Sequence, residues 1–441
     1  MRPKISWSDL HGARAGVWGL GVEGMASVRK LTSMGVGPVL VDDRPPPEGT
    51  DGRPVLATGD GGLEALAACE IVVKTPGISR YRTDLKELEE RGIPLVGGLG
   101  LWLQEAPKDR VVCITGTKGK SSTTAIAGHL LTRLGYRCLA GGNLGQPPYD
   151  PAQERIDYDY WVIETSSYQA TDLSCSPPVV AVTALNPDHL DWHHGVDAYY
   201  RDKLSACSQP GADLTIANAD SDLLRERVPL LGPRVDWIRA DDDPGADWMQ
   251  PLDLVGAHNR RNALIARACL LALGVPEACD DAALRAAADG FEHLASRLQV
   301  IGCVDGVTFV DDSLSTNVLP TLAAMDAFAG RRVALIAGGH DRGIDYAPLA
   351  TGLAGRDAPT MVLTLPDSGP RIQAAIKAVN HNPVQVTACA DLDLAVQRGF
   401  RWASPDGVVL LSPAAPSFGH FRNYRDRGDA FSRAMQACSA R

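Results

Sequence analysis

The stretch Ile114-Thr115-Gly116-Thr117-Lys118-Gly119-Lys120-Ser121-Ser122-Thr123-Thr124 carries the strongest structural signal in this chain. It follows an apolar run that begins at Val111 and precedes an alanine- and leucine-rich helical pattern from Thr124 to Leu134. A strand, a glycine loop and a helix in this order predict a turn whose backbone N–H groups hold a polyphosphate at a helix N-terminus. Only two residues separate the glycines, whereas the general P-loop pattern has four, so an ordinary strand-to-helix turn is the alternative.

The residue types in this loop favour a nucleotide. Gly116 and Gly119 allow the backbone to curl around oxygen atoms. Lys120 would reach the β- and γ-phosphates, and Ser121 or Ser122 would offer a hydroxyl group to Mg²⁺. We therefore expect ATP as the ligand, bound by Gly116, Thr117, Lys118, Gly119, Lys120, Ser121 and Ser122.

Length and composition narrow the class of protein. A chain of 441 residues is too long for one compact core, so two to four domains are expected. A net charge of −10 argues against a general nucleic-acid surface, which needs clustered Lys and Arg. The start of the chain lacks the apolar core of a signal peptide, and no apolar run is long enough to span a membrane. The ten cysteines lie singly, without a CxxC pair, so we expect a reduced, cytoplasmic protein.

The first hundred residues show a strand–turn–helix pattern. Residues 16–24 run from a strand into a helix through a glycine turn, and residues 39–43 form a second strand that ends in carboxylates. This is the shape of a dinucleotide fingerprint, but such a turn also suits any diphosphate, including that of a UDP-sugar, and an ordinary turn is the third possibility. Residues 71–78 add a strand that leads into a Pro-Gly turn. A Rossmann-like domain is predicted.

Polar residues also follow the strands of the central section. Asn143 lies in a glycine turn, Glu164 ends the run that begins at Trp161, and the run 179–183 leads to Asn186, Asp188, His189 and Asp191. In an open α/β sheet the carboxyl edge holds the ligands. Oxygen ligands with one histidine suit Mg²⁺ bound jointly by protein and phosphates, although each residue alone could be an ordinary loop residue.

Two helical segments carry further candidates. Lys203 lies on a predicted helix and, on physical grounds alone, is expected to be a solvated surface residue. Asn259 and Asn262 share a helix face and could contact a planar group such as adenine, with helix capping as the alternative. Strand-like runs at 307–310, 333–337 and 408–411 each end in a polar loop, which predicts another doubly wound domain. The fold class is α/β, with three domains in series.

Nine segments taken together resemble the Mur ligases. They occur in the family's order: GTKGKSS, GGNLG, ETSSYQ, NPDHLDWH, YYRDK, HNRRN, DDSLSTN, GGHDRG and SPAAPSFGHFRNYRDRG. The resemblance as a whole runs from about Gly19 to the C-terminus. The resemblance is closest to the branch that adds glutamate to UDP-N-acetylmuramoyl-L-alanine in peptidoglycan synthesis. It implies a Rossmann-like UDP-sugar domain at 1–105, a P-loop-type ATPase domain at 106–295 and a Rossmann-like amino-acid domain at 296–441.

The resemblance also implies roles for individual residues. Mg²⁺ ligation falls to Ser121, Glu164, His189 and Lys203, and Lys203 matches the family's carbamylated lysine. Catalytic roles are implied for Lys120, His189 and Lys203, although His189 as a base is a weaker assignment than His189 as a ligand. Asn259, Asn262, Arg297 and Asp312 match positions around adenine, phosphate and ribose. The UDP-sugar residues would be Gly21, Asp42, Arg44, Thr75, Gly77 and Asn143.

The expected chemistry has two steps. The substrate carboxylate attacks the γ-phosphate of ATP to give an acyl phosphate, and the amine of glutamate then displaces phosphate. Charge on the transferring group would be offset by Mg²⁺ and Lys120. The protein is expected to act as a monomer.

Three positions depart from the D-glutamate-adding members of the family. Those members typically carry lysine at the positions of Leu314 and Arg342, and phenylalanine at that of Tyr424. Arg carries a planar guanidinium group with several donors, whereas Lys carries a compact ammonium charge, so the exchange is expected to change the pocket that binds glutamate. The glutamate-binding residues are expected to be Thr316, Arg342, Ser417 and Tyr424, and our hypothesis is that the chain adds L-glutamate, with a separate epimerase acting on the product; D-glutamate is the alternative.

Three other functions compete with a Mur ligase. A folylpolyglutamate-synthetase-like ligase shares the phosphate loop and the carbamylated lysine but lacks the N-terminal domain. An NAD-dependent dehydrogenase accounts for the first glycine turn alone and leaves Glu164, His189 and Lys203 without a role. A nucleotide-gated binding module would hydrolyse ATP without needing an amino acid.

Overall fold

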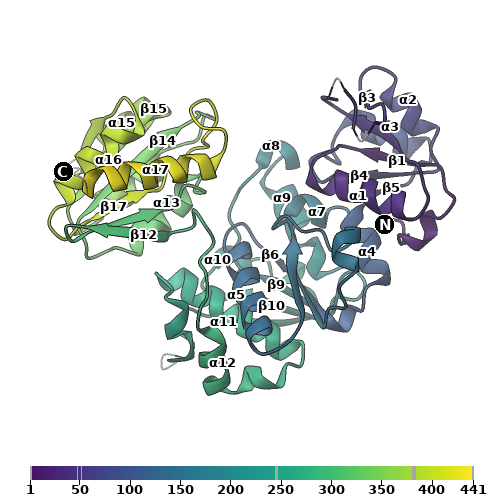
Figure 1. Ribbon diagram of the computed structural model, residues 1–441, viewed down its shortest axis with the longest axis horizontal. Helices are drawn as coiled ribbons and strands as arrows, with labels where there is room; N and C mark the ends of the chain where they lie inside the picture. Colours follow the sequence, from purple (N-terminus) through teal and green to yellow (C-terminus); the bar gives the residue numbers. More distant parts are fainter. Residues whose placement is uncertain (1, 47, 51, 244–246, 380–383, 440–441) are drawn as a thin grey trace. The chain divides into compact units, whose positions relative to one another are not determined.

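The computed structural model of the chain describes residues 2–46, 48–50, 52–243, 247–379 and 384–439. Three β-sheets follow one another along the sequence, each covered by helices (Figure 1). By compactness the chain divides into two units, one of residues 1–253 with 259–291 and the other of residues 254–258 with 292–441. The predicted boundary at 105/106 lies inside the first unit, and the boundary at 295/296 lies close to the junction of the two units.

The N-terminal sheet is entirely parallel, with strand order β3-β2-β1-β4-β5. Its chain order reverses between β1 and β4, which is where an open α/β sheet opens a crevice for ligands. The predicted strands and helices of this region are present. The elements are β1 (Ala15–Trp18), α1 (Val22–Ser33), β2 (Val39–Asp42), β3 (Leu56–Ala57), α2 (Gly62–Ala67), β4 (Ile71–Lys74), α3 (Thr83–Glu90), β5 (Leu95–Gly97) and α4 (Gly98–Glu105).

The central sheet is also parallel, with strand order β11-β10-β9-β6-β8-β7. β6 lies between β8 and β9, so the loops after these three strands meet at one edge. The strands are β6 (Val111–Thr115), β7 (Cys138–Gly142), β8 (Tyr160–Glu164), β9 (Val179–Val182), β10 (Leu214–Asn218) and β11 (Arg234–Ile238). The helices are α5 (Lys120–Arg133), α6 (Pro151–Glu154), α7 (Ser167–Ala170), α8 (Leu190–His193), α9 (Val196–Leu204), α10 (Asp222–Arg225), α11 (Ala257–Ala272) and α12 (Asp281–Ala288).

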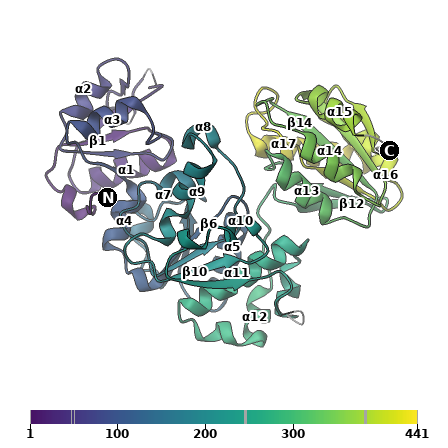
Figure 2. The same ribbon diagram turned by 180° about the vertical axis from the view of Figure 1, so that it is seen from behind.

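The C-terminal sheet has strand order β12-β13-β17-β14-β15-β16 and is parallel except for β12, which is antiparallel to β13. α16 and α17 cover one face (Figure 1), and α13 and α14 cover the other (Figure 2). The strands are β12 (Gln299–Val304), β13 (Val307–Asp311), β14 (Val333–Gly339), β15 (Thr360–Asp367), β16 (Gln385–Ala388) and β17 (Val408–Leu411). The helices are α13 (Val318–Asp326), α14 (Ala347–Ala354), α15 (Gly369–Ala378), α16 (Leu392–Ala403) and α17 (Tyr424–Ser439).

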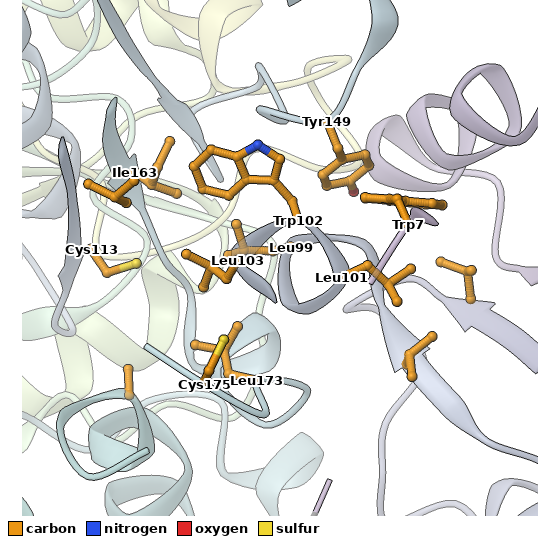
Figure 3. Packing of buried hydrophobic residues seen from close by; sticks show 14 of the residues in the cluster. Trp7, Leu99, Leu101, Trp102, Leu103, Cys113, Tyr149, Ile163, Leu173 and Cys175 are labelled. Atoms are coloured by element: carbon orange, nitrogen blue, oxygen red, sulfur yellow. The ribbon is translucent and has the colours of Figure 1, made fainter. Parts of the chain in front are cut away.

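Helix α4 joins the N-terminal and central sheets through one continuous hydrophobic core. Leu101 lies on the side of Trp7, whereas Leu99 and Leu103 lie on the side of Ile163 in β8 (Figure 3). All of these side chains are buried. Each buried side chain of this size contributes roughly 1.5–3 kcal/mol, so α4 makes the first two sheets one body.

Among the described residues, every helix is either too short or too polar to cross a membrane.

Candidate active site

The phosphate loop lies where the sequence predicts it, between β6 and α5. The helix begins at Lys120, four residues earlier than predicted, because Gly119 ends the loop in the left-handed region with φ +89°. A Cβ atom at Gly119 would lie 2.6 Å from Oδ1 of Asn262, so a side chain is excluded there. Gly116 has a φ of +135°, and a Cβ atom there would lie 2.3 Å from Oγ1 of Thr183, so a side chain is excluded at this position too. Both glycines are therefore required by conformation and by space.

Two lysines converge on this loop. Nζ of Lys120 donates to the carbonyl oxygen of Gly116 at 2.9 Å, and Nζ of Lys203 donates to the same oxygen at 3.0 Å. The expectation that Lys203 is a solvated surface residue is wrong, because the residue is 2% exposed. Tyr199, Tyr200 and Leu204 of the same helix are also buried, so this face of α9 packs inward. Burial, followed by the charge of Lys120, holds the pKa of Lys203 well below its usual value.

Glu164 ends β8 beside the loop and is 2% exposed. Its Oε1 accepts a hydrogen bond of 2.8 Å from the side-chain amide of Asn143. Its Oε2 is buried without a hydrogen-bond partner among the described residues. A buried carboxylate oxygen without a donor is costly unless a cation or another donor satisfies it. Asn143 therefore orients Glu164 and leaves one oxygen atom available.

His189 follows β9 and is the N-cap residue of α8, with φ +52°. Its side chain is 48% exposed, and its Nε2 lies 3.8 Å from Oδ2 of Asp188. The pKa of His189 is lowered, chiefly by desolvation, while Asp188 opposes this shift and Lys203 supports it. A histidine that stays neutral near pH 7 keeps a nitrogen lone pair for a metal ion or a proton.

These residues suit a divalent cation held together with phosphate oxygens. In the part of the chain that the structure describes, no three His, Cys, Asp or Glu side chains are arranged to hold a metal ion by themselves. Mg²⁺ does not need such a cage, because it is commonly bound by one or two carboxylates with substrate phosphates and water. The unsatisfied oxygen of Glu164 and the buried hydroxyl residue Ser121 fit that mode.

Asn262 and Asn259 lie together at the start of α11. The amide of Asn262 donates to Oδ1 of Asn259 at 3.2 Å, and Asn262 is buried against Gly119. The predicted shared face is thus present, and it adjoins the phosphate loop.

The residues predicted for the UDP-sugar follow β1, β2 and β4 at the point where the strand order reverses. Oδ2 of Asp42 accepts from the backbone N–H of Leu20 at 2.7 Å, and its Oδ1 accepts from that of Arg44 at 2.8 Å. Gly21 caps α1, while Thr75 and Gly77 directly follow β4. Of the predicted residues in the N-terminal domain, Gly21, Asp42, Thr75 and Gly77 flank the crevice or shape its loop. Arg44 lies beside them and is exposed. Asn143, the sixth residue of the predicted set, lies instead at the central edge, bonded to Glu164.

The C-terminal unit carries the remaining predicted residues. Asp312 is buried and accepts from the hydroxyls of Ser315 and Ser412 and from the N–H of Leu298, at 2.5, 2.7 and 3.2 Å. Desolvation raises the pKa of Asp312 to about 6. Arg297 lies between Ser296 and the start of β12 and is partly buried.

The residues predicted for glutamate follow three adjacent strands of the same sheet. Thr316 follows β13, Arg342 follows β14, and Ser417 follows β17, with Tyr424 at the start of α17. Arg427 joins two of these loops, because its Nη2 donates to the carbonyl oxygens of Ser313 and Ala415 at 2.7 and 3.1 Å. Ser417 and Arg427 also line a cavity of about 200 Å³ with Gly338, Gly339 and His420.

Sequence reasoning missed a polar cluster in the first compact unit, formed by the buried residues Ser167 and His193 and the partly buried Asp202. One signal was available in the sequence, since His193 lies four residues after His189 and Asp202 immediately precedes Lys203.

The sequence matches three family models in chain order. These are the MurD-like N-terminal domain of Mur ligases at residues 13–97, the Mur ligase middle domain at 114–250 and the Mur ligase glutamate ligase domain at 296–415. The curated relatives include proteins named UDP-N-acetylmuramoyl-L-alanine–L-glutamate ligase. One from a Micromonospora species is 41% identical over 97% of this chain and 98% of its own length. Another, from Xanthomonas euvesicatoria, is 38% identical over 96% and 95%.

Solved structures share the fold at low sequence identity. UDP-N-acetylmuramate-alanine ligase MurC from Thermotoga maritima superimposes with a TM-score of 0.56 at 18% identity, covering 96% of this chain and 99% of that one. MurF from Acinetobacter baumannii gives 0.57 at 15% identity, covering 100% and 93%.

The fold and the site therefore define an ATP-dependent ligase with three α/β domains. The chain belongs to the Mur ligase family, and its first domain is of the MurD-like type. The predicted family, fold class and enzyme class are confirmed. The dehydrogenase interpretation is excluded, because the glycine turn at residues 16–24 lies within the matched MurD-like domain.

Proposed function

We propose that this chain joins L-glutamate to UDP-N-acetylmuramoyl-L-alanine, with hydrolysis of ATP to ADP and phosphate, in the synthesis of peptidoglycan precursors. The observation that carries this proposal is the alignment, over 97% of the chain at 41% identity, with a relative named for this reaction. The same name recurs in a relative from Salinispora tropica that is 40% identical over 97% of the chain. These names favour the L-enantiomer over the D-glutamate alternative.

The substrates are assigned to the three domains as the sequence predicts. Residues 1–105 would bind the UDP-sugar at the ends of β1 and β4, and residues 106–295 would bind ATP at the loop after β6. Residues 296–441 would bind glutamate at the ends of β13, β14 and β17. Support comes from the placement of most of each predicted set at the carboxyl edge of its own sheet, where α/β proteins bind ligands, with Asn143, Arg297 and Asp312 as exceptions. A MurF ligase from Thermotoga maritima, solved in complex with ADP, has the same fold with a TM-score of 0.56.

The chemistry follows from the groups at the central edge. The carboxylate of the UDP-sugar attacks the γ-phosphorus of ATP, the bond to the bridging oxygen breaks, and an acyl phosphate and ADP result. The amine of glutamate then attacks the acyl carbon, loses a proton and displaces phosphate. Lys120 and the N–H groups of the loop after β6 offset the charge on the transferred group.

The metal site is part of the same proposal. Glu164, His189, Ser121 and Lys203 would hold Mg²⁺, which supplies charge neutralisation on the phosphates when bound. Lys203 would act as a carbamate, formed when its neutral amine adds CO₂ and loses a proton. The depressed pKa of Lys203 supports this, because only the neutral amine is a nucleophile. A carbamate also replaces a cation with an anion beside Lys120.

A cytoplasmic location is part of the same proposal. The ten cysteines lie singly along the sequence, without a CxxC pair, which supports a reducing, cytoplasmic location. A monomer and a separate epimerase remain predictions.

The deciding experiment measures phosphate release with ATP, Mg²⁺ and UDP-N-acetylmuramoyl-L-alanine, comparing enantiopure L- and D-glutamate. We expect release that requires the UDP-sugar and L-glutamate together. Release with D-glutamate but not with L-glutamate, in the presence of the UDP-sugar, would overturn the L-specific assignment. The changes at Leu314, Arg342 and Tyr424 would then have no effect on the choice of enantiomer. Release without an amino acid would favour an ATPase module.

A further inference from the structure

The polar cluster of Ser167, His193 and Asp202 lies in the first compact unit, with Ser167 and His193 buried and the Asp202 side chain 19% exposed. Nδ1 of His193 lies 2.6 Å from Oδ2 of Asp202, and its Nε2 lies 2.9 Å from Oγ of Ser167. His193 is 0% exposed. Because a carboxylate only accepts hydrogen bonds, Nδ1 of His193 donates to Asp202, while Nε2 is hydrogen-bonded to the Ser167 hydroxyl. Both ring nitrogens are therefore used.

Each member of the cluster lies next to a residue of the candidate metal site. Ser167 is three residues after Glu164, His193 is four residues after His189, and Asp202 immediately precedes Lys203. The three candidate ligands come from the end of β8, the N-cap position of α8 and α9, which are separate segments of the chain. The side-chain bonds of the cluster thus link α7, which follows β8, to α8 and α9.

A fourth segment joins from the N-terminal sheet. The hydroxyl of Tyr81 donates to the same Oδ2 atom of Asp202 at 2.9 Å. The hydroxyl of Ser79 donates to the backbone carbonyl oxygen of Trp192 at 3.0 Å. The indole N–H of Trp192 in turn donates to the backbone carbonyl oxygen of Gly77 at 3.3 Å. The loop that carries the candidate UDP-sugar residues is therefore bonded directly to α8 and α9.

The arrangement has the bonding pattern of a Ser–His–Asp nucleophile, but its burial excludes that role. Ser167 is 3% exposed, so a substrate carbonyl cannot approach its oxygen. The hydroxyl is also engaged with the imidazole from the first residue of a short helix, α7. Its bonds connect α7, α8 and α9 with one another.

We propose that His193 and Asp202 are positioning residues of the metal–nucleotide site, which fix Glu164, His189 and Lys203 relative to one another, with Tyr81 as the contribution of the first sheet. This inference rests on the proposed function, because it requires that those three residues bind a divalent cation with the nucleotide. Groups that orient metal ligands typically change metal affinity by about 10- to 100-fold when they are removed.

The test measures binding of Mn²⁺ to the full-length protein in the presence of ADP, from the electron paramagnetic resonance signal of free Mn²⁺. The variant His193→Asn keeps a donor for the bond to Asp202, whereas His193→Gln places its amide near Ser167 and keeps that bond instead. Comparing the two variants therefore separates the contributions of the two hydrogen bonds. Tyr81→Phe removes one hydroxyl. The matched control is Tyr136→Phe, since the Tyr136 hydroxyl donates to Oε2 of Glu277 at the same distance of 2.9 Å, away from the site.

We expect Mn²⁺ affinity to fall about 10- to 100-fold in the His193 variants and about fivefold in Tyr81→Phe, with wild-type affinity in Tyr136→Phe. Equal affinities in Tyr81→Phe, the His193 variants and the control would overturn the inference, even if melting temperatures fall, because stability alone would then be affected. If the His193 variants do not fold, Tyr81→Phe compared with Tyr136→Phe decides. A wild-type protein that binds ADP but no Mn²⁺ would overturn the proposed metal site itself, and this inference with it.

Discussion

The side-chain nitrogens of Lys120 and Lys203 share one acceptor, the carbonyl oxygen of Gly116, at 2.9 and 3.0 Å. Burial penalises the charge on Lys203 most strongly, and repulsion from the ammonium group of Lys120 at the same oxygen adds to this penalty. The arrangement therefore favours a neutral amine at Lys203, hydrogen-bonded to the loop after β6 that we propose binds the phosphates. It connects the helix α9 to the phosphate loop through a single backbone atom.

Replacement of Lys203 by alanine should lower turnover by roughly 100-fold or more, because it removes the amine that would carry the negatively charged carbamate. Small carboxylates such as acetate should restore part of the activity by occupying the space of the carbamate. The measurement is phosphate release at saturating substrates, with and without acetate. Lys30→Ala is the control, because Lys30 pairs with Glu154 away from the site. Full activity in Lys203→Ala would contradict the carbamate assignment.

The Glu164→Gln variant tests the buried unpaired oxygen. A glutamine can still accept the hydrogen bond from Asn143, so the fold should survive, but the negative charge is lost. We expect the Mg²⁺ concentration for half-maximal phosphate release to rise about tenfold or more. Glu277→Gln serves as the comparison. An unchanged Mg²⁺ requirement would remove Glu164 from the metal site.

Glu23 makes the stability of the first unit depend on pH. Its carboxylate accepts from the Gln169 amide at 2.8 Å and from the Tyr149 hydroxyl at 3.3 Å, and desolvation raises its pKa from 4.5 to about 7. The folded state therefore binds this proton more tightly than the unfolded state, so its stabilising contribution is present below pH 4.5 and is lost as the pH rises to about 7.

The corresponding variant is Glu23→Gln, which has no proton to lose. We expect the unfolding free energy of the wild type to fall relative to this variant by roughly 2–3 kcal/mol between pH 5 and pH 8. Thermal unfolding monitored by circular dichroism at the two pH values measures the difference. A constant difference between the two proteins would show that Glu23 titrates normally.

A buried ion cluster joins the N-terminal sheet to the central domain. Asp172 accepts from Nζ of Lys74 at 2.7 Å and from Nε of Arg80 at 2.5 Å, and all three side chains are at most 5% exposed. Lys74→Met leaves the carboxylate with one cation fewer, and removing one member of a buried pair costs about 3–5 kcal/mol. The melting temperature should therefore fall markedly. Exposed Arg137, which pairs with Asp159, provides the control Arg137→Met, for which little change is expected.

Much of the candidate site follows from local sequence. The strand, glycine loop and helix around Gly116 and Gly119 have a distinctive spacing, and the carboxyl ends of neighbouring parallel strands meet at one edge. These two facts are sufficient to predict that Lys120, Glu164 and His189 gather together. The start of α5 at Lys120 was missed, because its threonines and serines obscure the helical pattern.

Other features depend on long-range packing that no local pattern carries. The charged end of Lys203 is buried because α9 packs against the phosphate loop, which lies 87 residues earlier in the chain. The bond between Asn143 and Glu164 requires β7 to pair with β8, and the bond between Tyr81 and Asp202 joins residues 121 positions apart. Periodicity and turn chemistry specify elements and the edge at which their ligands lie. The partner of each buried polar group is set by which elements pack together, because desolvation penalises every alternative that leaves such a group unpaired.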